Sequence, residues 1–348
     1  MRILITGGCG FLGAHLVEHF LKNTDVRIGN NADTELILLD RLTYASSGYD
    51  RLRDVARGLP GGLPARVAVL GCDLSQPIPD GIEREIGQVD FVIHAAAETH
   101  VDNSIVDPVP FLKANVFGTH HLLWWARKQQ NLRRIFLIST DEVYGPASWS
   151  SPGNVETDPF RPANPYAAAK AGGEAIGMAY ANTYDLPVTI VNTMNLYGER
   201  QHREKFIPLV IRQVLTGGKV FIHADYTRTR SGTRFYIHAR NFASALMFLM
   251  DRFARYASPS NPIPMKVHVS GEREVSNLDL AMMIAGFIGM PLYSELVDFH
   301  SSRPGHDLRY ALDDSLVRNM GWVQPVGFGE SLARTVNWYL NNKQWLGL

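Results

Sequence analysis

Short apolar runs rich in β-forming residues recur between the N-terminus and residue 192, and the stretches between them show helical spacing of apolar positions. The runs cover residues 2–6, 35–40, 67–70, 91–94, 134–138 and 188–192. Runs that stay apolar at successive positions are typical of parallel strands covered on both faces. Their alternation with helices predicts an α/β protein with a Rossmann-type, doubly wound parallel sheet.

This alternation is lost from residue 201 onward, so we predict two domains. The first covers residues 1–193, and a strand and helix within 235–262 return to it. A smaller α/β lobe is formed by residues 194–234 and 263–348.

A glycine-rich turn follows the first strand and precedes the first helix. Gly7, Gly10 and Gly13 are spaced as G-x-x-G-x-x-G. Gly7 permits a tight turn, Gly10 lets backbone amides approach a pyrophosphate, and Gly13 lets the helix pack close to the strand. Although glycines at such a turn can be purely structural, the order of strand, turn and helix predicts a dinucleotide site in the first domain.

The second strand ends in Asp40, where a carboxylate can accept hydrogen bonds from the adenosine ribose and would repel a 2′-phosphate. NAD is therefore favoured over NADP, although the neighbouring Arg41 weakens this preference. The alternative is that Asp40 only begins a loop. Asp73, after the third strand, is placed to meet the adenine. Small residues after the fourth strand leave room for the cofactor backbone: Ala95, Ala96 and Ala97.

The fifth strand runs directly into Thr140, Asp141 and Glu142. Ligands of open α/β sheets bind beyond the carboxyl ends of the strands, so these side chains are expected to line a crevice. A Thr and an Asp after a strand can also simply cap the next helix. Two adjacent carboxyls would suit an acid and base pair if their protonation states differ.

Tyr166 and Lys170 lie near the start of an Ala-rich helix, and their i,i+4 spacing places them on one face. A nearby ammonium favours the phenolate, so we expect Lys170 to lower the pKa of Tyr166 towards that of a working base. Most Tyr and Lys residues at this spacing are surface pairs. The position of this pair just after the Thr-Asp-Glu strand favours a catalytic role.

Composition narrows the class of protein. Lys plus Arg and Asp plus Glu both number 34, so no global charge recruits nucleic acid or a membrane. The two cysteines, Cys9 and Cys72, indicate buried thiols in a reducing compartment rather than a disulfide framework. A strand that begins at Arg2 leaves no room for a signal peptide, and no Cys/His spacing indicates a metal site. A cytoplasmic protein is expected.

Taken together, the glycine fingerprint, the Thr-Asp-Glu segment and Tyr-x-x-x-Lys resemble the extended short-chain dehydrogenase/reductases, and within them the nucleotide-sugar 4,6-dehydratases of the dTDP-glucose type. The resemblance covers nearly the whole chain. Its motifs span residues 40–45, 96–104, 139–145, 204–209 and 303–310.

The resemblance implies an NAD cofactor and an NDP-hexose substrate bound by the second lobe. The implied NAD contacts are Phe11, Leu12, Asp40, Thr43, Asp73, Leu74, Ala96, Tyr166, Lys170 and Asn192. The implied substrate contacts are His100, Thr140, Asn195, Glu204, Lys205, Arg234, Arg303 and His306, with His268 in place of a usual Asn. Because His268 and a longer basic loop before Arg234 depart from the family pattern, the nucleotide base stays open. A homodimer through the helix of residues 111–130 and the Tyr166 helix is also implied.

The implied reaction is oxidation at C4, water elimination across C5 and C6, and hydride return to C6. Tyr166 and Lys170 serve as base and its support, Asp141 as acid and Glu142 as base, with Thr140 on the sugar O4. The alternatives are a nucleotide-sugar 4-epimerase, a UDP-glucuronate decarboxylase, and more remotely a non-catalytic NAD-sensing regulator. Asp141 beside Glu142 favours elimination, since neither rival enzyme needs an acid for a C6 hydroxyl.

Overall fold

A computed structural model describes residues 1–22, 34–43, 46, 48–256, 263–298 and 308–348. The chain forms two compact units, each assembled from separate stretches of sequence. Unit 1 comprises Met1–Val143, Asn164–Asn192 and Ala243–Val267, and unit 2 comprises Tyr144–Ala163, Thr193–Phe242 and His268–Leu348. The predicted domain division differs at four places: the segment Tyr144–Ala163 and the residue Thr193 belong to unit 2, and the returning segment begins at Ala243 and ends at Val267.

The core of unit 1 is a seven-stranded sheet in the order β11-β6-β5-β4-β1-β2-β3. Its strands are β1 (Arg2–Thr6), β2 (Glu35–Asp40), β3 (Val67–Gly71), β4 (Phe91–His94), β5 (Arg134–Thr140), β6 (Val188–Thr193) and β11 (Lys266–Val269). β1 pairs in parallel with both β2 and β4, so the strand order reverses direction at β1. This reversal is the point where open α/β sheets bind ligands. The predicted Rossmann-type sheet is confirmed.

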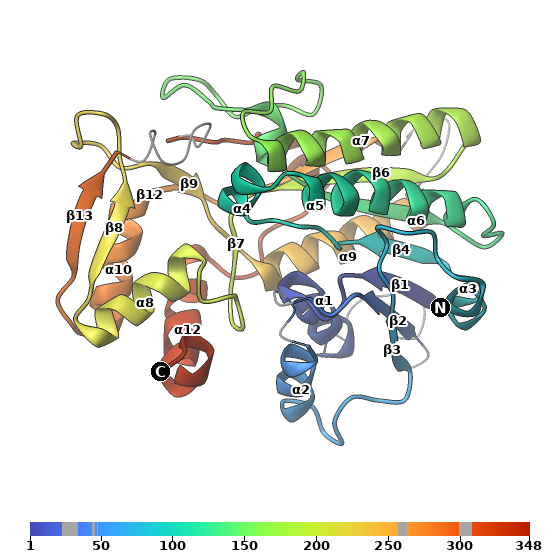
Figure 1. Ribbon diagram of the computed structural model, residues 1–348, viewed down its shortest axis with the longest axis horizontal. Coiled ribbons are helices and arrows are strands. Elements are labelled where there is room, and N and C mark those ends of the chain that lie inside the picture. Colours follow the sequence, from blue (N-terminus) through green and yellow to red (C-terminus); the bar gives the residue numbers. More distant parts are fainter. Residues whose placement is uncertain (23–33, 44–45, 47, 257–262, 299–307) are drawn as a thin grey trace. The chain divides into compact units, whose positions relative to one another are not determined.

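Helices cover both faces of this sheet because its strands are apolar at successive positions. They are α1 (Phe11–Lys22), α2 (Asp50–Arg57), α3 (Asp80–Ile86), α4 (Val101–Val106), α5 (Val109–Leu112), α6 (Gly118–Ala126), α7 (Pro165–Tyr184) and α9 (Ala239–Tyr256). Figure 1 shows α6 and α7 side by side along one face, with α1 and α2 on the other. An apolar cluster of the unit joins strand residues such as Leu4 and Ile135 to Leu122 and Trp125 of α6.

The helix predicted over residues 111–130 is interrupted. After α5, a π-helical turn, η3 (Lys113–Phe117), precedes α6, and the helix ends at Ala126. The turn carries Asn115, whose buried side chain accepts from the Glu98 amide (2.9 Å) and donates to the Glu98 carbonyl (3.0 Å). The wide turn therefore fixes the loop that follows β4.

Unit 2 combines short strands with helices around its own apolar core. The strands are β7 (Leu196–Tyr197), β8 (Lys219–His223), β9 (Thr233–Phe235), β10 (Ile237–His238), β12 (Glu274–Ser276) and β13 (Tyr293–Val297). They pair as β10 with β7, β12 with β9 and β13 with β8. The helical segments are α8 (Phe206–Thr216), α10 (Asn277–Ile288), α11 (Ser315–Asn319), α12 (Phe328–Asn341) and the 3-10 turn η5 (Lys343–Leu346). The core lies among α8, α10 and α12, around Ile211, Ile284 and Leu332.

The glycine turn of unit 1 makes a sharp stability prediction. A Cβ at Gly13 would lie 2.2 Å from the Gly7 carbonyl oxygen, and these backbone atoms cannot move without separating α1 from β1. We expect Gly13→Ala to cost at least about 3 kcal/mol of unfolding free energy. Gly81→Ala in α3 is the matched control, because nothing lies within 4 Å of its added Cβ. Denaturant titration of both variants tests this, and equal midpoints would contradict close packing at Gly13.

Candidate active site

The Thr-Asp-Glu segment lies where β5 ends. The buried strand delivers Thr140 to its last position, and Asp141 begins the 3-10 turn η4 (Asp141–Tyr144). The Thr140 hydroxyl donates to Asp141 Oδ1 over 2.8 Å and accepts from the Glu142 amide over 3.3 Å. One hydroxyl thus holds the two carboxylate-bearing residues in a fixed arrangement.

The start of α7 brings Tyr166 to this segment. Asn164 caps the helix by accepting from the Ala167 amide (2.8 Å), and Pro165 occupies the first turn. The same Asn164 side chain donates to Glu142 Oε2 over 3.0 Å. Tyr166, in the first turn, is buried, and its hydroxyl is hydrogen-bonded to Thr140. Helix capping and positioning of Glu142 are therefore done by one residue.

Lys170 lies one turn later on the same face of α7, as its spacing predicts. Its Nζ donates to the Ile138 carbonyl of β5 over 2.7 Å. Burial lowers the pKa of Lys170 to about 8. The Lys170 amine can therefore gain or lose a proton close to neutral pH, whereas an ordinary lysine stays an ammonium there.

The pKa of Tyr166 moves opposite to our expectation. Burial raises it above the ordinary tyrosine value, and the charge of Glu142 raises it further. The expected lowering by Lys170 is wrong for the protein alone, because the Lys170 ammonium is directed to the Ile138 carbonyl while Glu142 opposes the phenolate. The protein by itself holds Tyr166 protonated.

Asn192 has a different place from the one predicted. Its side chain is fully buried, and its Nδ2 donates to the Thr140 carbonyl (2.9 Å) and to Glu174 Oε1 (2.7 Å). Through these two bonds Asn192 supports the catalytic segment, and its expected contact with NAD stays a prediction.

The glycine turn has the geometry that a dinucleotide requires. Gly7 has φ +70, a conformation that L side chains rarely adopt, and an added Cβ there would lie 2.8 Å from the Ala96 amide nitrogen. Phe11 and Leu12 form the first turn of α1, whose N-terminus follows the glycines. Exposed N–H groups at a helix start favour a phosphate, so the residues present fit a pyrophosphate.

The adenosine end of the predicted NAD site is an open depression of ≈ 490 Å³ at the carboxyl ends of β2 and β3. It is lined by Asp40, Arg41, Leu42, Thr43, Gly71, Cys72 and Asp73. The Asp40 carboxylate accepts from the Cys9 amide (3.0 Å) and the Leu42 amide (2.7 Å), which fixes its orientation.

Of the two cysteines, Cys9 is buried as expected and Cys72 is half-buried, and both are free thiols.

Arg41 does not offer an unpaired charge to a 2′-phosphate. Its guanidinium forms an ion pair with Glu98 and lies 3.6 Å from Asp73 Oδ2. With Asp40 fixed and Arg41 neutralised, the local charge disfavours a second phosphate. The residues present therefore fit NAD, with Leu74 buried beside Asp73 and Ala95, Ala96 and Ala97 following β4.

A cofactor preference follows from these charges. We expect NAD to bind at least about tenfold more tightly than NADP, a difference of about 1.4 kcal/mol, because the Asp40 carboxylate repels the 2′-phosphate. Titration of both cofactors against the tryptophan fluorescence of the protein measures the ratio. Equal dissociation constants would contradict the role of Asp40.

Predicted substrate residues lie in both units. In unit 1, His100 precedes α4. In unit 2, Asn195 is exposed with φ 40, Glu204 pairs with His202 over 3.4 Å, and Lys205 precedes α8. Arg303 and His306 lie outside the described residues.

Two other predicted substrate residues are buried. Arg234 donates to the Thr233 carbonyl (2.7 Å) and the Leu308 carbonyl (2.8 Å), and its guanidinium lies 4.7 Å from the centre of the Tyr310 ring. His268 is fully buried, with Nε2 2.7 Å from the Tyr144 hydroxyl and Nδ1 3.1 Å from the Asp313 carbonyl. Within unit 2, His268 therefore joins Tyr144 to Asp313, and its expected contact with a nucleotide stays a prediction.

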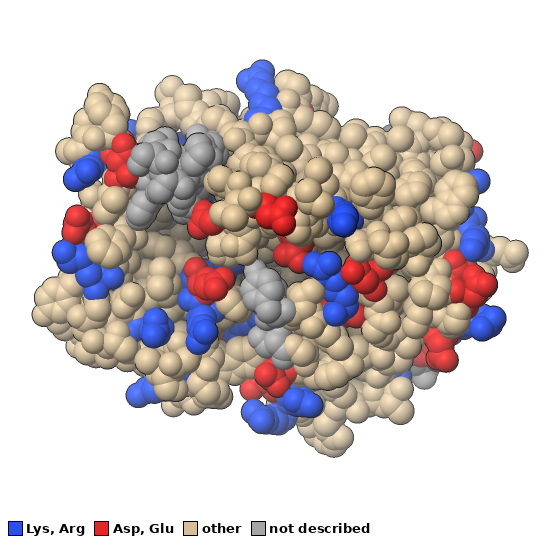
Figure 2. Space-filling view, in the orientation of Figure 1, with Lys and Arg blue, Asp and Glu red and all other residues tan. Residues whose placement is uncertain are grey.

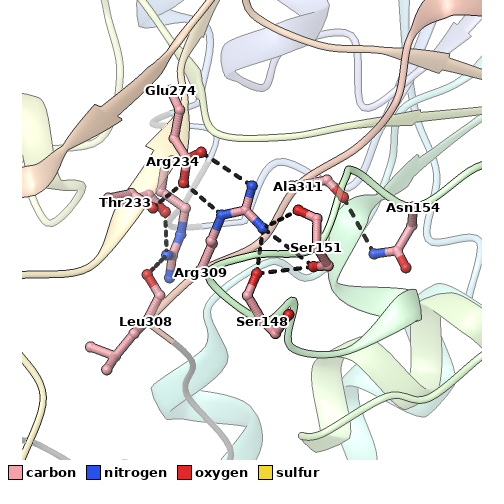
Figure 3. Close-up of polar contacts among 9 residues, drawn as sticks. All are labelled: Ser148, Ser151, Asn154, Thr233, Arg234, Glu274, Leu308, Arg309 and Ala311. Atoms are coloured by element: carbon pink, nitrogen blue, oxygen red, sulfur yellow. Dashed lines mark hydrogen bonds and ion pairs between the residues drawn. The ribbon is translucent and has the colours of Figure 1, made fainter.

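The Ser- and Pro-rich stretch of residues 148–160 is held by hydrogen bonds within unit 2. Figure 3 shows Arg309 between Glu274 and the carbonyl oxygens of Ser148 and Ser151, with distances of 2.8, 2.6 and 2.9 Å. Asn154 adds a bond from its side chain to the Ala311 carbonyl. A buried guanidinium thus anchors two turns of this stretch.

Sequence reasoning missed several residues that position the site. They are Ser104, which accepts from the Tyr166 amide, Asn115, Asn164, Glu174 and Lys266. Only Glu174 had a usable signal, because it continues the i,i+4 series of Tyr166 and Lys170.

Surface charge is mixed. Figure 2 shows Lys and Arg side chains interleaved with Asp and Glu on the face in view, in keeping with the equal totals of the two classes. Within the described ranges, no helix has the length and apolar content to cross a bilayer. Over the same part of the chain, no group of His, Cys, Asp and Glu could hold a metal ion.

The chain is similar to known proteins over nearly its whole length. A dTDP-glucose 4,6-dehydratase of Haemophilus influenzae is 34% identical over 360 residues, covering 98% of each chain. A trifunctional Arabidopsis thaliana protein with UDP-glucose 4,6-dehydratase activity is 32% identical over 99% of this chain and 48% of its own. The structure of the dTDP-glucose 4,6-dehydratase DesIV of Streptomyces venezuelae, with NAD bound, superposes with a TM-score of 0.82 at 33% identity, covering 99% of this chain and 98% of DesIV.

These similarities confirm the predicted resemblance, the dehydratase class and the NAD cofactor. A family signature matches residues 3–261. The chain therefore belongs to the NAD dependent epimerase/dehydratase family.

Proposed function

We propose that this protein is an NAD-dependent 4,6-dehydratase of an NDP-hexose, of the dTDP-glucose or UDP-glucose type. The observation that carries the proposal is the grouping of Asp141 and Glu142 around the Thr140 hydroxyl, which is itself bonded to Tyr166. Epimerisation needs the tyrosine and lysine alone. Two carboxyls beside them supply the acid and base that elimination of water requires.

The oxidation half of the reaction uses Tyr166 and Thr140. NAD, when bound, would supply the acceptor and later the donor of the hydride, and the positive charge of its oxidised ring would favour loss of a nearby proton. Tyr166 takes the proton of the sugar O4, and Thr140 orients the same oxygen by a hydrogen bond. Since burial and Glu142 keep Tyr166 protonated in the protein alone, Tyr166 must first release its own proton to solvent when cofactor and substrate bind.

The elimination half uses the two carboxyls. A ketone at C4 acidifies the hydrogen on C5, and Glu142, held by Asn164, removes it as a proton. Asp141 donates a proton to the departing C6 hydroxyl, so that one water leaves. Asp141 is buried at the end of β5, beside the Thr140 hydroxyl.

The substrate residues proposed for the nucleotide and sugar are His100, Thr140, Asn195, Glu204, Lys205, Arg234, Arg303 and His306. Among them, Arg234 contributes mainly by shaping unit 2, because its guanidinium already bonds two backbone carbonyls. We leave His268 out of this set because it is fully buried.

The direct test is mass spectrometry of products after incubation with dTDP-glucose, UDP-glucose, UDP-N-acetylglucosamine, CDP-glucose and GDP-mannose in separate reactions. We expect loss of one water from a dTDP- or UDP-hexose, without consumption of added NAD. Constant mass with changed sugar stereochemistry would overturn the proposal in favour of a 4-epimerase. Loss of carbon dioxide from UDP-glucuronate would favour a decarboxylase.

We further propose a homodimer formed through the helical segment of α5, η3 and α6 together with α7. Leu112, Phe117 and Trp124 on this segment are large apolar side chains that are exposed in the single chain. Exposed apolar groups gathered on neighbouring turns are typical of an interface.

The dimer proposal predicts that Phe117→Arg halves the mass measured by light scattering after gel filtration, because it buries a charge in the interface. Val323→Arg is the matched control, since Val323 is 79% exposed and lies in unit 2. An unchanged mass for Phe117→Arg would rule out this surface.

A cytoplasmic location is also proposed, because Cys9 and Cys72 are free thiols.

A further inference from the structure

A buried ion pair lies beneath the catalytic residues of unit 1. Glu174 follows Tyr166 and Lys170 on one face of α7, and its Oε2 lies 2.8 Å from Lys266 Nζ at the start of β11. The two side chains are 1% and 6% exposed. Desolvation makes such a pair a poor source of stability, and apolar residues of the same size would pack as well. A role other than packing is therefore indicated.

The pair is connected to the catalytic segment by hydrogen bonds. Glu174 Oε1 accepts from Asn192 Nδ2 over 2.7 Å, and the same nitrogen donates to the Thr140 carbonyl over 2.9 Å. Each of these side chains is buried. The position of Thr140, and with it the hydroxyl that holds Asp141 and Glu142, thus depends on where Lys266 holds Glu174.

The pair also acts on Lys170 through its charge. Burial lowers the pKa of Lys170 to about 8, while the Glu174 carboxylate acts in the opposite direction. From β4, His94 faces Lys170 as a neutral ring, because burial lowers the pKa of His94 to about 3. From β5, the Ile138 carbonyl accepts from Lys170. Glu174 is therefore the charge that favours the protonated form of Lys170, and Lys266 holds that charge in place.

We propose that Glu174 and Lys266 are positioning residues for the reaction, which hold Thr140 through Asn192 and set the charge of Lys170. This inference rests on the proposed function for its kinetic consequence. Its electrostatic part concerns only residues of this chain and is measured without substrate.

Three variants separate charge from packing. E174Q removes a negative charge and should move the titration of Lys170 to lower pH by about one unit. K266M removes a positive charge and should move it to higher pH. The double variant E174Q/K266M restores the net charge with groups of similar size, so its titration should return towards that of the wild type. Removing one partner of a buried ion pair destabilises the fold, whereas replacing both partners does not leave a buried charge unpaired. The double variant is therefore also the control for loss of stability in the single variants.

The titration is measured by competitive acetylation with trace acetic anhydride at a series of pH values, with Lys170 quantified by peptide mass spectrometry against the exposed Lys343. Opposite shifts in the two single variants support the inference. A Lys170 titration that is the same in E174Q, the double variant and the wild type overturns it, even if every variant is less stable.

The kinetic consequence is a change in the pH dependence of kcat. A shift of one unit lowers the ammonium fraction of Lys170 at pH 8 from about one half to about one tenth, so E174Q should lose about fivefold in kcat there with KM unchanged. The exposed pair Glu83 and Lys128, 2.9 Å apart, gives the control variants E83Q and K128M, which should leave the profile in place. If acetylation shows the shifts but no sugar nucleotide turns over, the inference stands and the proposed function fails.

Discussion

Tyr166→Phe should abolish reduction of the cofactor during the first turnover. The substitution removes only the hydroxyl that takes the proton from the sugar O4, and general base catalysis of this kind contributes about 10²–10⁴-fold. In a rapid-mixing experiment with substrate and bound NAD, the absorbance of reduced nicotinamide should stay flat while the wild type shows a transient. NAD affinity should be retained, because the ring of Tyr166 still packs against Phe111.

The control for this experiment is Tyr180→Phe on the same helix. Tyr180 is also mostly buried, and its hydroxyl lies 2.8 Å from His120 Nδ1, so both variants lose a bonded phenolic oxygen. Tyr180→Phe should leave the transient intact. A normal transient in Tyr166→Phe would show that another group accepts the O4 proton.

Asp141→Asn should arrest the reaction after the oxidation step. Without a proton donor for the C6 hydroxyl, water cannot leave, and we expect kcat to fall by about 10²–10³-fold while reduced nicotinamide still forms. The amide keeps an oxygen that can accept from Thr140, so the local geometry is retained. Quenched samples should contain the 4-keto hexose with its C6 oxygen still in place.

Glu142→Gln should block a different step of the elimination, the removal of the proton from C5. Run in deuterated water, Asp141→Asn should still exchange the hydrogen at C5 with solvent, whereas Glu142→Gln should not. Glu142→Gln also removes the carboxylate charge that raises the pKa of Tyr166, so its oxidation step should be at least as fast as that of the wild type. Exchange at C5 in Glu142→Gln at the wild-type rate would remove Glu142 from the role of base.

The parts of this protein that were predictable are those encoded within one strand and the turn after it. Gly7 to Gly13 and Thr140 to Glu142 each follow an apolar run, and the carboxyl ends of parallel strands meet at one edge of a sheet. Tyr166 and Lys170 are likewise a local pattern, fixed by helical spacing. Each of these predictions needs no knowledge of how distant segments meet.

The remaining features depend on contacts between distant segments. Lys266 has no local pattern that distinguishes it from a surface lysine, and only β11 lying next to β6 brings it to Glu174. The bond from Asn192 to the Thr140 carbonyl likewise joins two strands that are distant in sequence, and the family resemblance, which implies an NAD contact for Asn192, does not reveal it. The pKa of Tyr166 was misjudged for the same reason: one neighbour was visible in the sequence, whereas burial and Glu142 were not.

The π-helical turn η3 has a consequence for insertions and deletions. A π turn holds one residue more than an α-helical turn, so the extra residue is taken up locally and the flanking helices α5 and α6 keep their faces. Deleting a single residue such as Ala114 would close the segment into a continuous α-helix, with Leu122 and Trp125 still in the core. Asn115 would then lose the wide turn that brings it to the Glu98 backbone. The loss of one residue should therefore spare the packing of the helices and disturb the loop after β4.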